Sequence, residues 1–225
     1  GLVPLVVREP FVARLQGLSL RNVRATLYRG EQELASEFGE MLFTHYGVSG
    51  PIILTLSSLA SRWLPQEPLR LVLDLKPALD NAQLDARLRH DLAAMGKAGY
   101  HTLLKGLLPK SLIPVFAELS GIPAEQALSQ FTAAQRQRVL ALLKALELTV
   151  VDTRPVAEAI ITLGGVPCEE LDPITFESRL IPGLHFAGEI IDIAGDTGGY
   201  NLQIAFTTGR LAGEHAARIA AAADG

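Results

Sequence analysis

The residues best suited to chemistry lie near the C-terminus, where a loop of glycines and an acid precedes a helical pattern. This loop is Gly195-Asp196-Thr197-Gly198-Gly199, and it follows the apolar segment Leu184–Ala187 and the pair Gly188-Glu189. Adjacent glycines let the backbone approach a planar or anionic group closely. The N-terminus of the following helix would add a partial positive charge. The loop could therefore hold an electron-rich carbonyl or a phosphate, or it could be an ordinary glycine turn before a helix.

Three further side chains are candidates for chemistry of their own. Glu189 is expected at the end of a strand, where its carboxylate could accept hydrogen bonds from ribityl hydroxyls or simply be solvated. His45 lies within the mixed segment 39–51 and could donate a proton near neutral pH. A lone histidine is, however, more often a hydrogen-bonded structural residue. Cys168 lies between Pro167 and Glu169, and the neighbouring acids disfavour a thiolate, so we expect it to be inert.

The glycine spacing excludes the common cradle for a dinucleotide pyrophosphate. None of the 20 glycines lies two residues from another, so the chain has no Gly-x-Gly-x-x-Gly, and it has no Walker loop either. Metal-ligand spacing is lacking in residues 77–147, and the sequence predicts no metal site.

Composition limits the partners and the compartment. The net charge of −4 argues against nucleic acid or an anionic membrane as the main partner. No apolar run approaches the ~20 residues that span a bilayer. A single cysteine excludes an internal disulfide. We therefore expect a cytoplasmic protein. The apolar start at Gly1, without an initiating methionine, predicts a piece of a longer chain.

The elements that must position these residues change in type along the chain. Alternating side chains predict a β-rich, barrel-like domain with one helix from Ile52 to Leu64, and capping boxes at Asp80 and Thr132 predict a helical segment. The fold class is α+β with an α/β element: an inserted β-rich domain with a helical subdomain, plus a C-terminal strand–helix return. The predicted segments are 1–76 (β-rich domain, first part), 77–147 (helical subdomain), 148–178 (return of the β-rich domain) and 179–225 (C-terminal part of the cofactor domain).

Three motifs, taken in order, resemble one known family. They are the segment Gly39–Pro51, the turn Gly164-Gly165-Val166, and the stretch from Phe186-Ala187-Gly188-Glu189 through Gly198-Gly199-Tyr200-Asn201-Leu202-Gln203. They resemble the BaiN-like flavoproteins, also called the aminoacetone-oxidase family of NAD(P)/FAD-dependent oxidoreductases, over essentially all 225 residues. The resemblance implies a two-dinucleotide-binding-type FAD domain built from both ends of a longer chain, with the β-rich and helical parts inserted between them.

The resemblance also implies where a cofactor would bind. Family members carry a first βαβ unit, with the glycine fingerprint and a ribose-binding acid, before the position of Leu2. Gly188 and Glu189 would lie near the ribityl–phosphate part of FAD, and the start of the last helix at the pyrimidine edge of the isoalloxazine. The implied cofactor-binding residues are Gly188, Glu189, Asp196, Gly198, Gly199, Asn201 and Leu202. The implied pocket for a small-molecule substrate contains Thr44, Tyr46, Gly164 and Gly165, and His45 is the candidate for catalysis.

Two hypotheses follow for function. In the first, the parent protein is a cytoplasmic FAD-dependent oxidoreductase with NAD(P)H as its candidate electron donor. This chain alone would bind FAD weakly or not at all. In the second, the chain is a non-catalytic module. It would complete its sheet with the missing N-terminal half or a partner chain, through Leu184–Ala187 and the helix that carries Gly209 and Gly213.

Overall fold

The computed structural model describes residues 1–195 and 197–223. The chain divides into two compact units, which we describe separately. The barrel unit is formed by Pro4–Thr153, and the C-terminal unit by Gly1–Val3 together with Arg154–Gly225. Among the described residues, no helix is long and apolar enough to cross a membrane.

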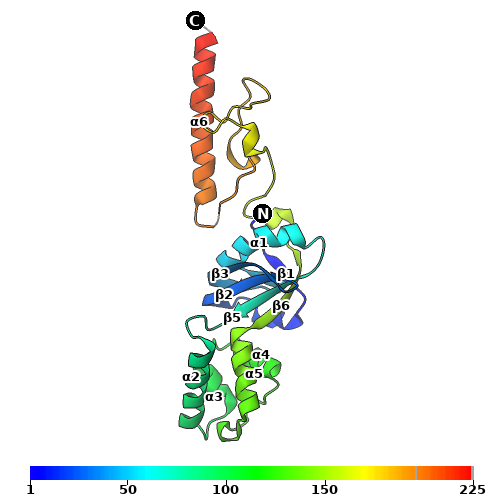
Figure 1. Ribbon diagram of the computed structural model, residues 1–225, viewed down its shortest axis with the longest axis vertical. Coiled ribbons are helices and arrows are strands. Elements are labelled where there is room, and N and C mark those ends of the chain that lie inside the picture. The colour runs from blue at the N-terminus through cyan, green and yellow to red at the C-terminus, as the bar shows by residue number, and fades with distance from the viewer. Residues whose placement is uncertain (196, 224–225) are drawn as a thin grey trace. The chain divides into compact units, whose positions relative to one another are not determined.

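A closed antiparallel barrel is the centre of the barrel unit (Figure 1). Its strands are β1 (Leu5–Val7), β2 (Ser19–Arg29), β3 (Gln32–Phe43), β4 (Gly47–Ser49), β5 (Leu69–Asp74) and β6 (Leu146–Thr153), in the spatial order β1-β4-β3-β2-β5-β6. The strands alternate between buried and less buried residues, as in Leu69, Leu71 and Leu73 of β5. Because a strand's side chains point to opposite faces in turn, this alternation fills the barrel interior. The predicted β-rich domain is confirmed.

The connections within the barrel follow local signals in the sequence. Gly30 has a positive φ of 55° at the tight turn that joins β2 and β3 into a hairpin. A short 3-10 helix, η1 (Pro10–Leu15), joins β1 to β2. The predicted helix after Gly50 is α1 (Pro51–Trp63), with Pro51 in its first turn. A Cβ atom on Gly50 would lie 2.9 Å from the Met41 Cα, so only glycine fits this approach to β3.

The predicted helical subdomain is inserted between β5 and β6. In Figure 1 its helices lie together next to the β5 and β6 side of the barrel. Its elements are α2 (Asn81–Ala94), α3 (Tyr100–Lys105), α4 (Ile113–Ser120), η2 (Leu128–Gln130) and α5 (Ala133–Lys144). Both predicted capping boxes form: Asp80 and Gln83 exchange bonds at the start of α2, and Thr132 and Gln135 do so at α5. Each satisfies two N–H groups that the helix leaves without partners.

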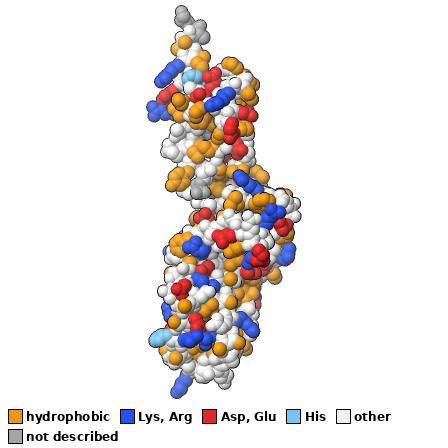
Figure 2. Space-filling view, viewed as in Figure 1, with side chains coloured by type: hydrophobic (Ala, Val, Ile, Leu, Met, Phe, Trp, Pro, Cys, Tyr) orange, Lys and Arg blue, Asp and Glu red, His pale blue; other side chains and the backbone are white. Residues whose placement is uncertain are grey.

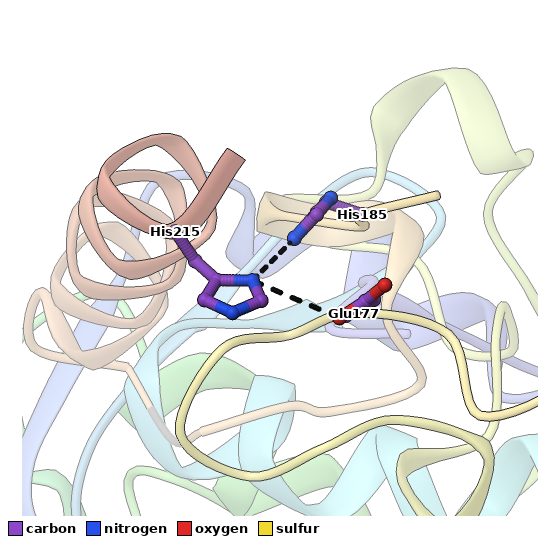
Figure 3. A group of neighbouring side chains, drawn as sticks. All are labelled: Glu177, His185 and His215. Atoms are coloured by element: carbon purple, nitrogen blue, oxygen red, sulfur yellow. Dashed lines mark hydrogen bonds and ion pairs between the residues drawn. The ribbon is translucent and has the colours of Figure 1, made fainter. Parts of the chain in front are cut away.

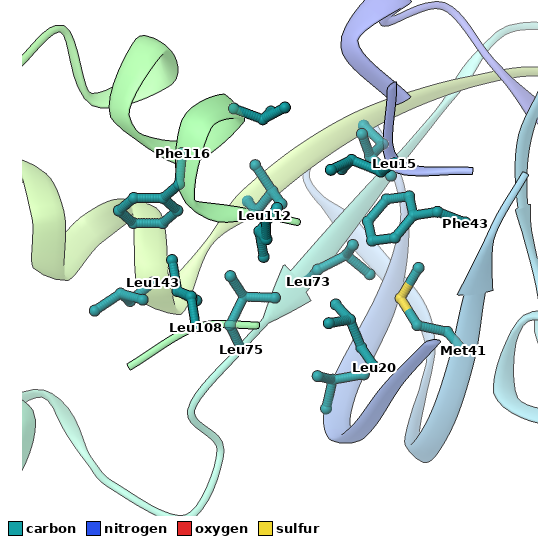
Figure 4. Close-up of a cluster of buried hydrophobic side chains, with 14 of the residues drawn as sticks. Leu15, Leu20, Met41, Phe43, Leu73, Leu75, Leu108, Leu112, Phe116 and Leu143 are labelled. Carbon is teal, nitrogen blue, oxygen red and sulfur yellow. The ribbon is translucent and has the colours of Figure 1, made fainter. Parts of the chain in front are cut away.

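One hydrophobic core runs from the barrel interior into the helical subdomain (Figure 4). Phe43 and Leu73 fill the barrel end of this core, whereas Phe116 and Leu143 fill the helical end. Tyr100 is fully buried and donates a hydrogen bond to Ser120 Oγ at 3.2 Å. Burial raises the pKa of the Tyr100 phenol to about 12, so it is a neutral core side chain.

The C-terminal unit is built differently, from short turns and one long helix. Its elements are η3 (Val156–Glu158), η4 (Cys168–Glu170), η5 (Gly188–Ile190) and α6 (Tyr200–Ala223). The helix predicted after the glycine loop is present as α6. The segment 159–162 and the expected strand Leu184–Ala187 each form only a single bridge, Ile161 with Leu2 and His185 with Glu177. Among the described residues of this unit, no neighbouring strand runs beside either segment to extend the pairing.

Replacing Leu71 with alanine should destabilise the barrel unit by about 2–5 kcal/mol, because the side chain is fully buried and a cavity would remain. Urea unfolding measures this effect through the fluorescence of Trp63, the single tryptophan of the chain, which lies at the end of α1. Phe38 of β3 is 54% exposed, so Phe38→Ala is the control, with an expected loss below about 1 kcal/mol. Equal losses in both variants would contradict the inward orientation of Leu71.

Candidate functional site

The predicted cofactor-binding residues that the structure describes belong to the C-terminal unit, in η5 and at the start of α6. Gly188 and Glu189 belong to η5, while Gly198 and Gly199 immediately precede α6. Asn201 and Leu202 occupy the first turn of α6. Asp196 lies outside the described residues.

Asn201 fixes the loop before α6 by a pair of hydrogen bonds to one residue. Its Oδ1 accepts from the Gly195 N–H at 2.8 Å, and its Nδ2 donates to the Gly195 carbonyl at 2.8 Å. A side-chain amide that bonds both backbone groups of one residue acts as a clamp, because neither bond can shift without weakening the other. The Asn201 side chain therefore holds the two ends of the glycine loop together.

The glycine pair uses backbone angles that favour glycine. Gly198 and Gly199 have φ values of 122° and 93°, which other residues rarely adopt. A Cβ atom on Gly199 would meet no other atom within 4 Å, so the backbone there is open to an approaching group. Next to it, Tyr200 and Leu202 are 63% and 64% exposed. The start of α6 therefore combines an accessible backbone, apolar side chains and the positive end of a 24-residue helix.

A second fixed point joins η5 to the middle of α6. The Gly188 N–H donates to Thr208 Oγ1 at 2.9 Å, and this hydroxyl donates in turn to the Ile204 carbonyl at 2.8 Å. Thr208 is buried, whereas the neighbouring Glu189 is exposed. Gly188 has a φ of 75°, and a Cβ atom there would meet nothing within 4 Å. The turn thus presents an open backbone and one carboxylate beside the helix.

The turn Gly164–Gly165 lies against the same part of the unit. The Gly164 N–H donates to Asp192 Oδ1 at 3.0 Å, and Val166 pairs in parallel with Ile191. A Cβ atom on Gly165 would lie 2.2 Å from the Ile190 carbonyl oxygen, so the close approach requires glycine. The structure therefore brings this predicted pocket segment next to η5.

Thr44, His45 and Tyr46 belong to the barrel unit, in the turn between β3 and β4. Thr44 Oγ1 accepts from the Gly47 N–H at 3.1 Å, and the His45 and Tyr46 rings meet edge to face at 4.8 Å. His45 is exposed. These contacts explain the turn itself, and roles in catalysis or substrate binding remain predictions.

Sequence reasoning missed several residues that organise this unit. Thr208 and Asp192 make the contacts described above, but nothing in the local pattern marks either as a bonding partner. Glu177, His185 and His215 form a cluster whose ligand atoms all lie within 4.8 Å of one another (Figure 3). Eight and thirty residues separate these three along the chain, so no short motif indicates them.

Comparison with known proteins places the whole chain among larger relatives. The family described as "HI0933-like protein barrel and H2TH domain" matches residues 1–161. A 3-dehydro-bile acid delta(4,6)-reductase of Clostridium scindens is 34% identical over 218 residues, which cover 96% of this chain and 53% of the relative. Ribosomal RNA dihydrouridine synthases of Haemophilus influenzae and Escherichia coli are 32% and 34% identical, over 92% of this chain and 49% of each relative. The chain spans about half the length of the curated relatives it matches.

Replacing Thr208 with valine should loosen η5, because the Gly188 N–H loses its acceptor while the buried shape of the side chain is kept. A lost hydrogen bond of this kind corresponds to about 1–3 kcal/mol of local stability. Amide hydrogen exchange of Gly188 should therefore accelerate by about tenfold or more.

Thr207→Val is the matched control for that measurement. Thr207 is exposed and accepts only from the Gln203 side chain in the bonds that the structure records. Exchange at Gly188 should be unchanged in this variant. Faster exchange in both variants would show that loss of a hydroxyl anywhere on this turn of α6 disturbs η5.

Proposed function

The chain belongs to the HI0933-like family, the BaiN-like flavoproteins, and from this membership we propose that the full-length protein is an FAD-dependent oxidoreductase. The observation that carries the proposal is the clamped glycine loop at the start of α6, with Asn201 bonded to both backbone groups of Gly195. When bound, FAD supplies a carrier that accepts and releases a hydride. NAD(P)H is the electron donor that we propose.

The residues at the start of α6 fit the ring end of a flavin. The open backbone of Gly199 allows a planar group to approach without meeting a side chain. Leu202 supplies an exposed apolar surface for such a group, and the helix N-terminus stabilises negative charge that develops on it. In this proposal Gly198, Gly199, Asn201 and Leu202 hold the pyrimidine edge of the isoalloxazine.

Gly188 and Glu189 fit the ribityl part of the cofactor. The Gly188 backbone is fixed by Thr208 and open on its other side. The exposed Glu189 carboxylate can accept hydrogen bonds from hydroxyl groups. We assign these two residues to the ribityl–phosphate region, and Asp196 keeps its predicted place among the cofactor-binding residues.

For the substrate we propose a pocket beside the flavin ring. Gly164 and Gly165 are its best-supported members, because they adjoin η5 in the C-terminal unit. Thr44 and Tyr46 of the barrel unit remain proposed substrate-binding residues, and His45 a proposed proton donor. The relatives' names give two unlike substrates, a bile acid and ribosomal RNA, so neither one transfers directly to this chain.

We propose that the pyrophosphate end of FAD is bound outside these 225 residues. No Gly-x-Gly-x-x-Gly occurs here, and the curated relatives are about twice as long as this chain. Hydrophobic side chains reach the surface of the C-terminal unit in Figure 2, and Ile174, Leu180 and Phe206 are 73%, 69% and 71% exposed. An apolar surface of this kind favours a partner in contact with it.

The identity of that partner separates the two candidate functions. If it is the remainder of the same polypeptide, the full-length protein is an enzyme. If it is a separate chain, the 225 residues are a binding module without catalysis of their own. Purified full-length protein that carries no flavin absorbance, even after incubation with FAD, would exclude the first candidate.

Replacing Asn201 with alanine in the full-length protein should lower FAD content several-fold, because both bonds that shape the glycine loop are lost. FAD per protein is measured from the visible spectrum of the purified protein. Gln203→Ala is the control, because Gln203 lies two residues further along α6 and is exposed. Among the described residues, its side chain donates a hydrogen bond to Thr207 alone. Unchanged FAD content in Asn201→Ala would remove the loop from the binding site.

A further inference from the structure

We propose that Glu177, His185 and His215 bind one divalent transition-metal ion of the zinc class. The three residues converge from two elements of the C-terminal unit, as Figure 3 shows. This site is separate from the proposed flavin site and does not depend on it. The argument rests on the geometry of the two imidazoles, the hairpin that carries Glu177, and the open space beside them.

The hairpin places Glu177 and His185 side by side. They are direct partners in an antiparallel bridge. Its flanking bonds run from Ser178 N to the Leu184 carbonyl at 2.7 Å and from Phe186 N to the Phe176 carbonyl at 3.0 Å. Residues between such bonds form a non-hydrogen-bonded pair, whose side chains approach more closely than in the other kind of pair. The backbone itself therefore presents a carboxylate and an imidazole together.

His215 completes the cluster from α6. His185 Nε2 and His215 Nδ1 are 2.9 Å apart, and His215 Nδ1 lies 3.7 Å from Glu177 Oε2. Two imidazole nitrogens bound to one tetrahedral zinc ion at about 2.0–2.1 Å lie about 3.3 Å from each other. The histidine pair is a few tenths of an ångström closer than that, so small rotations of the two rings and of the carboxylate would bring all three ligands to one ion.

Hydrogen bonds with the backbone of Gly183 orient two of the ligands. His185 Nδ1 lies 3.2 Å from the Gly183 carbonyl. When its N–H donates there, Nε2 carries a lone pair that faces His215. Glu177 Oε1 accepts from the Gly183 N–H at 2.7 Å, which leaves Oε2 for the ion. Metal-bound histidines are oriented by the same kind of outer contact. Without an ion, a proton on His215 Nδ1 bonds the two rings; binding requires that proton to reside on Nε2 instead.

The donor set selects the class of metal. Two imidazoles and one carboxylate suit zinc, nickel, cobalt or iron, whereas calcium and magnesium prefer oxygen ligands in greater number. A cavity of about 390 Å³ adjoins the cluster and is lined by Asp172, Arg179 and His215 among others. Water can occupy the remaining coordination positions from this side.

Zinc content after dialysis tests the proposal. The full-length protein is treated with chelator, dialysed against micromolar Zn²⁺, and analysed for zinc per chain. His185→Gln and His215→Gln should each lower zinc affinity by at least about tenfold, since an outer-shell change alone has effects of that size. Glu177→Gln should also weaken binding, although its side chain still accepts from the Gly183 N–H and keeps the hairpin.

His90→Gln is the matched control, because His90 is an exposed histidine of α2 in the other unit. It should bind zinc as the unmodified protein does. In addition, Zn²⁺ should raise the melting temperature of the protein and of His90→Gln but not that of His215→Gln. Zinc retained in full by the double variant His185→Gln/His215→Gln, or no zinc bound by the unmodified protein, would overturn the proposal.

Discussion

Pairing of β1 with β6 is the constraint on which the barrel unit depends. These strands are separated by most of the unit's sequence, yet Leu5 pairs with Thr153 and closes the barrel. Glu9 reinforces the closure beyond the strand, since both its carboxylate oxygens accept from the Thr149 N–H at 3.0 and 2.9 Å. Because the first and last strands pair, the segments between them can vary without opening the barrel. The helical subdomain is such a segment, inserted between β5 and β6. Where it leaves β5 and returns to β6, the Leu75 N–H donates to the Leu143 carbonyl at 2.8 Å.

The C-terminal unit is organised by another principle. Regular pairing is limited to isolated bridges among its described residues, so side-chain bonds to backbone perform the work that strands perform in the barrel. Thr208 holds η5, and Asn201 holds the glycine loop. Bonds of this kind fix a few backbone positions and leave the neighbouring surface open. That is a suitable arrangement for binding a large planar cofactor, and it agrees with the exposed apolar side chains of this unit.

Features encoded locally could be predicted, and features created by distant contacts could not. The capping box at Asp80 predicts the start of α2, and the alternation along β5 predicts which of its residues are buried. The start of α6 was also predictable, because a glycine pair before an apolar periodic segment is a local signal. The strand expected at Leu184–Ala187 was wrong in extent, since strand formation depends on a neighbour that the segment's own sequence does not contain. The same reason hid Thr208 and His215, whose partners are 20 and 30 residues away.

The long helix α6 carries both proposed sites at different heights. Asn201 and His215 are separated by fourteen residues along it, which corresponds to about 21 Å at 1.5 Å per residue. A metal ion at His215 would therefore be too distant to touch a flavin ring at the helix start. Its effect would be to join the hairpin that carries Glu177 and His185 to α6. Thr208, which lies between Asn201 and His215 on the helix, joins η5 to α6 in a similar way. Because a metal bond constrains a surface hairpin more strongly than one neutral hydrogen bond, the ion would set the rigidity of the unit rather than its chemistry.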